Sequence, residues 1–464
     1  MIEKAKNAKE AALKLANLTS AEKNKALLRI ADSIDNNRKE ILAANRKDIE
    51  LASSLVTAGK MSKALLHRLI LDNSKIDEII LSVKNVAELD DPVGKTLAAI
   101  ELDKDLELFQ VSCPIGVIGA IFESRPDVLV QIASLCLKTG NTLLLKGGSE
   151  ARNTNKALFD LITEATTSSI PEADAIPIPA PVPAGWLQLL DTREDVNEML
   201  KLNEYIDLIV PRGSNEFVKY IQDNTSIMVL GHSEGVCHIY IDRYADIDMA
   251  LNISYDAKVQ YPAVCNAAET LLVDAAIASA FLPRMIEQYL RAGVEIRACV
   301  KTMEFGLIPG PGFVEAENLL KSASEEDWRT EYNDLIISIK IVDGLDEAIA
   351  HINHYGSGHT DAIVTENRER ALTFLQSVDS SSVMHNASTR FSDGFRYGKG
   401  AEVGISTYKV HARGPVGLEG LVIYKYLLVS KGPHGHTVAP YTGDNAKKFT
   451  HKKIAAEDRG REKI

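Results

Sequence analysis

A cysteine beside an amide, Cys265-Asn266, is the part of the sequence whose residue types could carry out covalent chemistry. It follows a polar run that ends in Tyr261-Pro262 and precedes the apolar run 271–273, which predicts a loop between a helix and a buried strand. A thiolate in such a loop is a nucleophile, and backbone N–H groups there can point at the group that the sulfur attacks. The alternative is a buried structural cysteine, because single-cysteine patterns are weak outside a family context.

Three polar turns follow runs that predict buried strands, namely Glu123–Asp127, Lys146–Glu150 and Pro211–Ser214. In open parallel sheets, ligands bind beyond the carboxyl ends of the strands. The third turn places Gly213-Ser214 directly before a predicted helix, and a helix N-terminus of this kind can hold an anion. None of the turns has the G-x-G-x-x-G spacing, so a bound nucleotide needs a variant of the usual Rossmann turn. For each turn the alternative is an ordinary strand-to-helix loop.

The elements that position these turns predict an α/β protein. Residues 1–90 predict helices, one of which opens with the capping box Thr19–Glu22. Strands and helices then alternate from 114 to 222 and again from 227 to 386, starting with a strand over 227–230. This alternation predicts parallel sheets.

Five other segments precede, interrupt or follow this alternation. Residues 97–111 predict a β-hairpin, with which the predicted strand 421–429 could pair and which could form an oligomer contact. The glycine-rich stretch 397–418 predicts no strands, and the five prolines of 171–183 predict a surface loop or linker. From residue 431 onward the chain is polar, and we expect disorder.

Composition restricts the function classes. The length of 464 residues allows roughly three domains of about 150 residues. A net charge of −12 argues against non-specific nucleic-acid binding. The five cysteines contain no CxxC pair, which argues against a disulfide framework or a metal site and favours a reducing cytoplasm. We find no signal peptide and no apolar run long enough to cross a membrane.

A set of collinear motifs over about residues 1–430 carries a resemblance to a known family. The motifs are Phe122–Asp127, Leu144–Ala151, Pro211–Ser214, Gln260–Asn266, Tyr355–Ile363, Asn386–Gly394, Gly400–Ser406 and His411–Leu418. Together they resemble the γ-glutamyl phosphate reductases of the aldehyde dehydrogenase superfamily. The chain departs from that pattern in 171–183 and beyond Gly432, outside the motifs.

The resemblance implies an aldehyde dehydrogenase-like fold with two Rossmann-like α/β domains and a small β-hairpin oligomerisation element. The resemblance implies an NADP-binding domain over 1–95 and 113–233, with part of 400–418. It implies a catalytic domain over 234–400 that carries the nucleophilic cysteine. Oligomerisation strands over 96–112 and 419–430 and a polar tail over 431–464 complete the implied chain.

The resemblance also implies the second step of proline biosynthesis, the NADPH-dependent reduction of L-glutamate 5-phosphate to L-glutamate 5-semialdehyde with release of phosphate. The catalytic candidates are Cys265 as the nucleophile, with the Cys265 backbone N–H, Ser124 and Asn266 as oxyanion donors. Candidate binders of NADPH are Lys146, Gly213, Ser214 and Glu331. Candidate binders of the substrate carboxylates and phosphate are Arg125, Asn386, Ser388, Thr389, Arg390 and His411.

Two rival functions remain at this stage, an oxidising or CoA-acylating dehydrogenase of the same fold and a catalytically silent binding protein. The position of the base that hydrolyses the thioacyl enzyme in oxidising relatives falls at or beside Gly231, which cannot take a proton, although Glu234 could reach in. We expect a cytoplasmic enzyme with a small-molecule substrate, no metal, no nucleic acid and no membrane partner. A homo-oligomer is expected, and association with a glutamate 5-kinase is left open.

Overall fold

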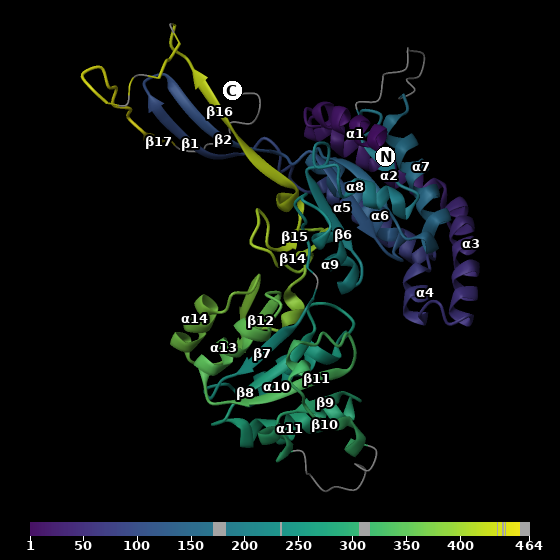
Figure 1. The fold of residues 1–464 in the computed structure, drawn as a ribbon, viewed down its shortest axis with the longest axis vertical. Coiled ribbons are helices and arrows are strands. Elements are labelled where there is room, and N and C mark those ends of the chain that lie inside the picture. The colour runs from purple at the N-terminus through teal and green to yellow at the C-terminus, as the bar shows by residue number, and fades with distance from the viewer. Residues whose placement is uncertain are drawn as a thin grey trace. The chain divides into compact units, whose positions relative to one another are not determined.

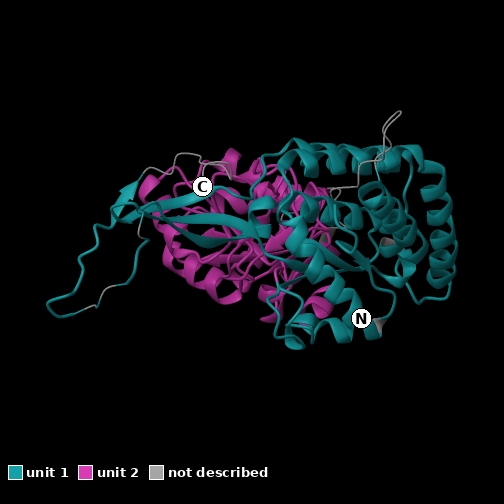
Figure 2. Ribbon diagram, turned by 90° about the horizontal axis from the view of Figure 1, so that it is seen from above, with its two compact units in different colours: residues 1–213, 220–229, 417–464 teal, residues 214–219, 230–416 magenta. Residues whose placement is uncertain are grey.

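The computed structural model describes residues 1–169, 182–232, 234–305, 316–433, 435–438, 440 and 442–454. The chain divides into two compact units (Figure 2). Unit 1 consists of Met1–Gly213, Tyr220–Val229 and Gly417–Ile464, and unit 2 of Ser214–Lys219 and Leu230–Val416. Residues 400–416, which the sequence analysis assigned in part to the cofactor domain, therefore lie in unit 2.

Unit 1 is built on a four-stranded parallel sheet with the strand order β5-β4-β3-β6. Figure 1 labels strand β6 of this sheet and helices α1 to α8 of the same unit. Every residue of its strands β3 (Val117–Phe122) and β4 (Thr142–Lys146) is buried. Such continuous apolar strands are typical of a parallel sheet covered on both faces. The other elements of this α/β layer are α1 (Ile2–Leu15), α2 (Ser20–Asn36), α3 (Arg38–Thr57), α4 (Lys63–Leu69), α5 (Asn73–Glu88), α6 (Pro126–Thr139), α7 (Arg152–Thr167), β5 (Leu187–Leu189), α8 (Arg193–Met199), β6 (Leu208–Arg212) and α9 (Asn215–Asp223), of which α9 spans both units.

Local signals explain several of these boundaries. Thr19 accepts a hydrogen bond from the backbone of Glu22, whose side chain accepts from the backbone of Thr19, so the predicted capping box is confirmed. Helix α6 ends at Gly140, which adopts a left-handed conformation with φ of 72°, as a helix C-terminus commonly requires.

A second, antiparallel sheet belongs to unit 1 and has the order β16-β2-β1-β17. The predicted hairpin is formed by β1 (Thr96–Asp103) and β2 (Leu106–Pro114), and β16 (Val422–Ser430) pairs with β2 along its whole length. The expectation of a wholly disordered tail is wrong, because β17 (Lys452–Ile454) pairs with residues 99–101 of β1.

Unit 2 contains a seven-stranded sheet in the order β10-β9-β11-β8-β7-β12-β13, in which all pairs are parallel. Its apolar core includes Ile239 and Leu271 of the central strands and Phe281 of a covering helix. The elements are β7 (Cys237–Ile241), α10 (Ile247–Val259), β8 (Ala268–Asp274), α11 (Ala278–Arg291), β9 (Glu295–Ala298), α12 (Val300–Met303), β10 (Leu320–Ser322), β11 (Ile336–Val342), α13 (Leu345–Tyr355), β12 (Thr360–Val364), α14 (Arg368–Ser377) and β13 (Ser382–His385).

Two expectations from the sequence are corrected by the structure. Residues 227–230 form no strand, because only Val229 makes an isolated bridge to Ile209. The stretch 397–418 is not strandless, since β14 (Gly404–Ser406) pairs with β15 (Gly414–Val416). Most of the proline-rich segment 171–183 lies outside the described residues. In the described part of the chain, no helix has the length and apolarity required to span a membrane.

Candidate active site

Cys265 lies in the loop between α10 and β8, as the sequence predicted, and its side chain is half-buried. The loop packs against the start of the neighbouring strand β7, where the thiol of Cys237 donates to the backbone carbonyl of Cys265 over 3.2 Å. Both cysteines stand at the amino-terminal edge of the parallel sheet. The hydrogen bond from Cys237 therefore holds the Cys265 loop against strand β7.

Gly235 allows this close approach. A Cβ atom at Gly235 would lie 2.3 Å from the carbonyl oxygen of Cys265 and 2.7 Å from its Cα and Cβ atoms. Since real Cβ contacts are never this short, any side chain at position 235 must displace the cysteine loop. The sequence alone gave no sign of this contact, because the two residues belong to different loops.

The two cysteines of this edge differ in environment. Cys237 is fully buried, and burial together with the charge of Asp361 raises the pKa of its thiol well above the usual range. It therefore stays protonated and acts as a hydrogen-bond donor. Cys265 is the more exposed of the pair, which leaves its sulfur available to a substrate.

Residues 388–392 contact the Cys265 loop through two hydrogen bonds. Thr389 donates its hydroxyl to the carbonyl of Asn266 over 2.7 Å, and the side-chain amide of Asn266 donates to the carbonyl of Ser392 over 2.8 Å. The side-chain oxygen of Asn266 is buried and has no hydrogen-bond partner among the described residues. Asn266 thus holds the loop in place, while its predicted role as an oxyanion donor stays a prediction.

Arg390 brings a buried positive charge to the same loop. Its Nε donates to the side chain of Gln260 over 3.0 Å, and the carbonyl of Arg390 accepts from Arg396. Burial, and then the neighbouring Arg396, lowers the pKa of Arg390, whereas the charges of Asp256, Cys265 and Asp393 raise it. An arginine stays protonated under such shifts. A cation in contact with this loop favours anionic groups near it.

A buried ion pair lies behind the loop. Lys258 of α10 donates to Glu269 of β8 over 2.6 Å, and both side chains are inaccessible to solvent. Burial raises the pKa of Glu269 to about 7, although the charge of Lys258 opposes this shift, and burial also lowers the pKa of Lys258. The pair joins the two elements that flank Cys265.

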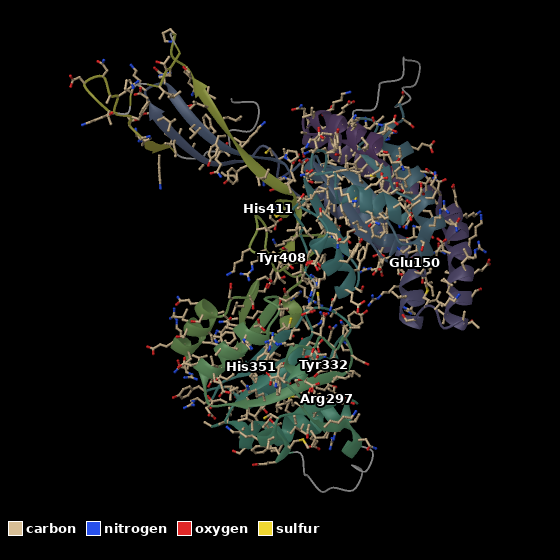
Figure 3. All side chains as sticks on the ribbon, in the orientation of Figure 1. Glu150, Arg297, Tyr332, His351, Tyr408 and His411 are labelled. Carbon is tan, nitrogen blue, oxygen red and sulfur yellow. The ribbon has the colours of Figure 1, made fainter. Side chains whose placement is uncertain are left out.

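Ser124 of unit 1 lies after β3 and has an unusual backbone conformation, with φ of 44°. Its N–H and its hydroxyl both donate to one carboxylate oxygen of Glu150, over 2.6 and 2.7 Å. Glu150 extends from the turn after β4 (Figure 3). In this structure both hydrogen-bond donors of Ser124 are therefore engaged by Glu150. The sequence analysis did not predict this contact.

The predicted cofactor residues lie in both units. Lys146 ends β4, is buried and donates to the carbonyl of Gly147 over 2.5 Å. Gly213 belongs to unit 1 and Ser214 to unit 2, where the Ser214 hydroxyl accepts from a backbone N–H in the first turn of α9. Glu331 accepts from the side chain of Asn215, over 2.9 Å within unit 2.

The remaining substrate candidates lie in both units. Arg125 begins α6 in unit 1 and pairs with Asp127 over 3.0 Å. Both ends of the Asn386 side-chain amide bond to the backbone of Thr365, which indicates a structural role at the carboxyl edge of the sheet. Ser388 caps the turn of Arg390. His411 is exposed in the connection between β14 and β15 (Figure 3).

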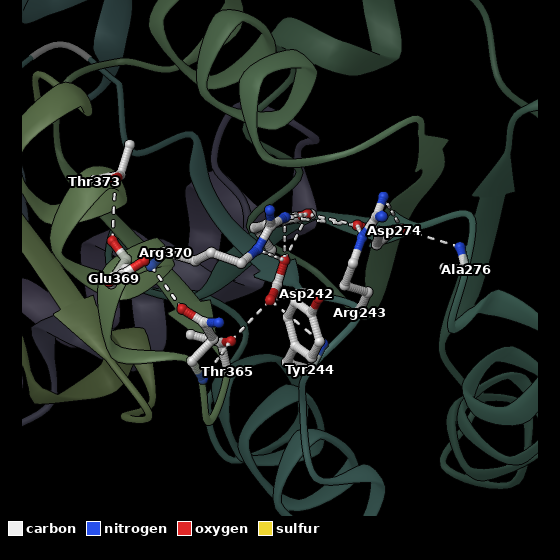
Figure 4. Close-up of polar contacts among 11 residues, drawn as sticks. Asp242, Arg243, Tyr244, Asp274, Ala276, Thr365, Glu369, Arg370 and Thr373 are labelled. Atoms are coloured by element: carbon white, nitrogen blue, oxygen red, sulfur yellow. Dashed lines mark hydrogen bonds and ion pairs between the residues drawn. The ribbon is translucent and has the colours of Figure 1, made fainter.

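The carboxyl edge of the sheet in unit 2 holds an ion-pair network (Figure 4). Tyr240 donates its hydroxyl to both Asp242 and Asp274, over 3.1 Å each. Arg370 pairs with Asp242 over 2.5 Å and Arg243 with Asp274 over 2.9 Å. Because both carboxylates are buried and compensated, this network stabilises the strand ends and leaves no carboxylate for chemistry.

Comparison with known proteins yields close relatives. Residues 1–302 match the model of the aldehyde dehydrogenase family. A γ-glutamyl phosphate reductase of Methanosarcina acetivorans is 55% identical over 451 residues, covering 96% of each chain, and one of Pelotomaculum thermopropionicum is 54% identical, covering 98% of each. The crystal structure of a γ-glutamyl phosphate reductase from Thermotoga maritima superposes with a TM-score of 0.84 at 42% identity, over 93% of this chain and 98% of that chain. Glyceraldehyde-3-phosphate dehydrogenase GapN of Methanocaldococcus jannaschii, solved with NADP, shares the fold at 19% identity, with a TM-score of 0.61 over 92% of this chain and 95% of that chain.

Proposed function

Because the chain belongs to the aldehyde dehydrogenase family, and within it to the γ-glutamyl phosphate reductases, we propose that it reduces L-glutamate 5-phosphate to L-glutamate 5-semialdehyde with NADPH and releases phosphate. This is the second step of proline biosynthesis. The observation that carries the proposal is the half-buried Cys265 in a loop that Arg390 contacts through Gln260, in a chain that matches these reductases over nearly its full length.

The residues suit an acyl-transfer reaction. The Cys265 thiolate attacks the acyl carbon, the S–C bond forms, and the C–O bond to phosphate breaks so that phosphate leaves with the electron pair. When bound, NADPH supplies the hydride that reduces the resulting thioester, and the sulfur then leaves as the aldehyde forms. Arg390 favours the thiolate and attracts the anionic substrate. Arg125, Ser388, Thr389 and His411 remain proposed contacts to its carboxylates and phosphate.

The cofactor proposal agrees with the shape of the turn after β4. A Cβ atom at Gly147 would lie 2.1 Å from the side chain of Asn155, and one at Gly148 would lie 1.9 Å from that of Glu150. A side chain at either glycine would therefore have to displace a neighbouring side chain of this turn. We propose that Lys146 holds the 2′-phosphate of NADPH, that Gly213 and Ser214 contact its pyrophosphate, and that Glu331 binds the nicotinamide ribose.

A reverse assay tests this function. The purified chain is incubated with glutamate semialdehyde, NADP⁺ and phosphate, and NADPH formation is followed. We expect formation of NADPH that requires phosphate. Formation that requires coenzyme A in place of phosphate would indicate an acylating aldehyde dehydrogenase. No reaction, together with a Cys265 thiol that does not react with iodoacetamide, would indicate a binding protein.

We further propose a homo-oligomer that forms through β16. This strand lies at the edge of its sheet and exposes Tyr424, Tyr426 and Leu428, a pattern that a monomer normally avoids. Light scattering should give a multiple of the 50.7 kDa chain mass, and Tyr426→Lys should reduce the mass to that of a monomer. A monomeric unmodified chain would contradict the proposal.

A cytoplasmic location and contact with a glutamate 5-kinase complete the proposal. All five cysteines are free thiols, which suits a reducing compartment. Transfer of an acyl phosphate between two enzymes limits its hydrolysis in water. Co-sedimentation of the purified chain with a glutamate 5-kinase measures the association, and its absence at micromolar concentrations would contradict it.

A further inference from the structure

Three side chains that can bind metals converge at the amino-terminal edge of the sheet in unit 2. The sulfur of Cys265 and one ring nitrogen each of His232 and His359 all lie within 4.8 Å of one another. His232 precedes β7, Cys265 precedes β8 and His359 directly precedes β12. These three strands are neighbours in the order β8-β7-β12, so the sheet register holds the three residues together.

The Nδ1 atom of each histidine ring has a hydrogen-bond neighbour. The Nδ1 atom of His232 lies 2.9 Å from the carbonyl oxygen of Ile405, which can only accept, so Nδ1 carries the hydrogen and Nε2 carries the lone pair. The Nδ1 atom of His359 lies 2.9 Å from the hydroxyl of Thr360. Histidines that bind metals almost always engage their second nitrogen in this way.

His359 supplies an independent observation. Its side chain is fully buried, and its Nε2 atom has no hydrogen-bond partner among the described residues. A buried polar atom without a partner carries an energetic cost, so its presence needs an explanation. A ligand that accepts the Nε2 lone pair removes this cost.

We propose that Cys265, His232 and His359 form a reversible binding site for Zn²⁺. One thiolate and two imidazoles are a donor set that selects zinc over magnesium or calcium, which require oxygen ligands. Tetrahedral zinc brings such donors to about 3.3–3.6 Å from one another, so side-chain movements of about 1 Å complete the site. Three protein ligands leave the fourth position to water.

Zinc binding removes the nucleophile. The cation takes the electron pair of the Cys265 sulfur, and the thiol proton is released to solvent. No oxidation occurs, so a chelator restores the thiol. Zinc binding itself does not depend on the proposed reductase activity, whereas inhibition by zinc rests on it.

Binding is measured first, without substrate. Equilibrium dialysis of the full chain should give one saturable Zn²⁺ per chain, and Co²⁺ in its place should give a thiolate-to-cobalt charge-transfer band. Cys265→Ser should abolish the site. His232→Gln and His359→Gln, which keep a donor for the ring's present partner, should each raise the dissociation constant at least about 100-fold, since removal of an outer-shell partner alone costs 10–100-fold.

Matched controls are His354→Gln, an exposed histidine outside the cluster, and Cys299→Ser, a half-buried cysteine outside it. Both should bind Zn²⁺ as the unmodified chain does. Zn²⁺ should block the alkylation of Cys265 by iodoacetamide in the unmodified chain but not in His232→Gln. This variant is chosen because His232 is half-buried, so the substitution disturbs the fold least. Circular dichroism checks that each variant is folded.

Several outcomes would overturn the site. These are the absence of saturable binding by the unmodified chain, binding that survives Cys265→Ser, binding that is unchanged in both histidine variants, or a cobalt complex without a thiolate band. Activity is then measured with and without Zn²⁺ and a chelator. An enzyme that is inactive even with the chelator would refute the proposed function and leave the binding result standing.

Discussion

The buried pair Lys258–Glu269 leads to a prediction whose size follows from the structure. Both side chains have no exposure to solvent, and their charged atoms are 2.6 Å apart. Lys258→Met removes the cation and leaves a buried carboxyl without a charge partner. Breaking a buried pair in this way costs about 3–5 kcal/mol, whereas replacing both partners by neutral side chains costs much less. We therefore expect Lys258→Met to be strongly destabilising and the double variant Lys258→Met, Glu269→Gln to recover most of the loss.

The pH dependence of this loss has a definite sign. Burial raises the pKa of Glu269 from 4.5 to about 7 in the folded chain, so its contribution to stability is fully present below about pH 4.5 and is lost as the pH rises through about 7. Without Lys258 the folded carboxyl must stay protonated at higher pH as well. The difference in the free energy of unfolding between Lys258→Met and the unmodified chain should then grow by about 1.4 kcal/mol for each pH unit above about 7.

Urea denaturation of the single and double variants at two pH values above neutrality measures both effects. The control is Lys301→Met, because Lys301 pairs with Asp343 on the surface, where 61% and 73% of the two side chains are exposed. That variant should lose no more than about 1 kcal/mol at either pH. The reasoning is refuted if the effects of the two substitutions at 258 and 269 are additive, or if the difference between Lys258→Met and the unmodified chain does not change with pH.

Three further predictions concern the site. Cys265→Ser should keep the fold and lose nearly all turnover in the reverse assay, whereas Cys299→Ala should keep most of it, and an active serine variant would exclude the covalent route. Lys146→Ala should raise the KM for NADPH far more than that for NADH, and equal changes would place the lysine away from the 2′-phosphate. Gly235→Ala should sharply slow alkylation of the nucleophile because its Cβ would lie 2.3 Å from the cysteine loop, and an unchanged rate would show that the loop yields.

Regular patterns in the sequence predicted much of the fold. The predicted strands over 114–121, 143–145 and 271–273 correspond to the buried strands β3, β4 and β8, because a strand covered on both faces favours apolar residues in succession. The pairing of β16 with the early hairpin was also foreseen, since a hairpin needs a further partner to be stable.

Features that depend on partners remote in sequence were missed. Strand β17 consists of Lys452–Ile454, whose two lysines give no strand signal, and it forms because the edge of β1 offers unpaired backbone groups. The left-handed conformation of Ser124 is stabilised by two hydrogen bonds to Glu150, in the turn of another strand. The short strands β14 and β15, with three residues each, are likewise set by pairing and not by their own composition.

The position of the thiol within unit 2 shows how a general rule about sheets must be applied to a particular sheet. Ligands in open parallel sheets usually bind at the carboxyl edge, and the turns that end β3 and β4 in unit 1 lie there. In unit 2 that edge is filled by Asp242 and Asp274, whose charges are neutralised by Arg370 and Arg243. Cys265 instead precedes its strand β8, at the amino-terminal edge, and the buried Arg390 donates a hydrogen bond to Gln260 of the same loop. The rule about strand ends therefore does not predict the position of Cys265, which lies at the opposite edge of its sheet.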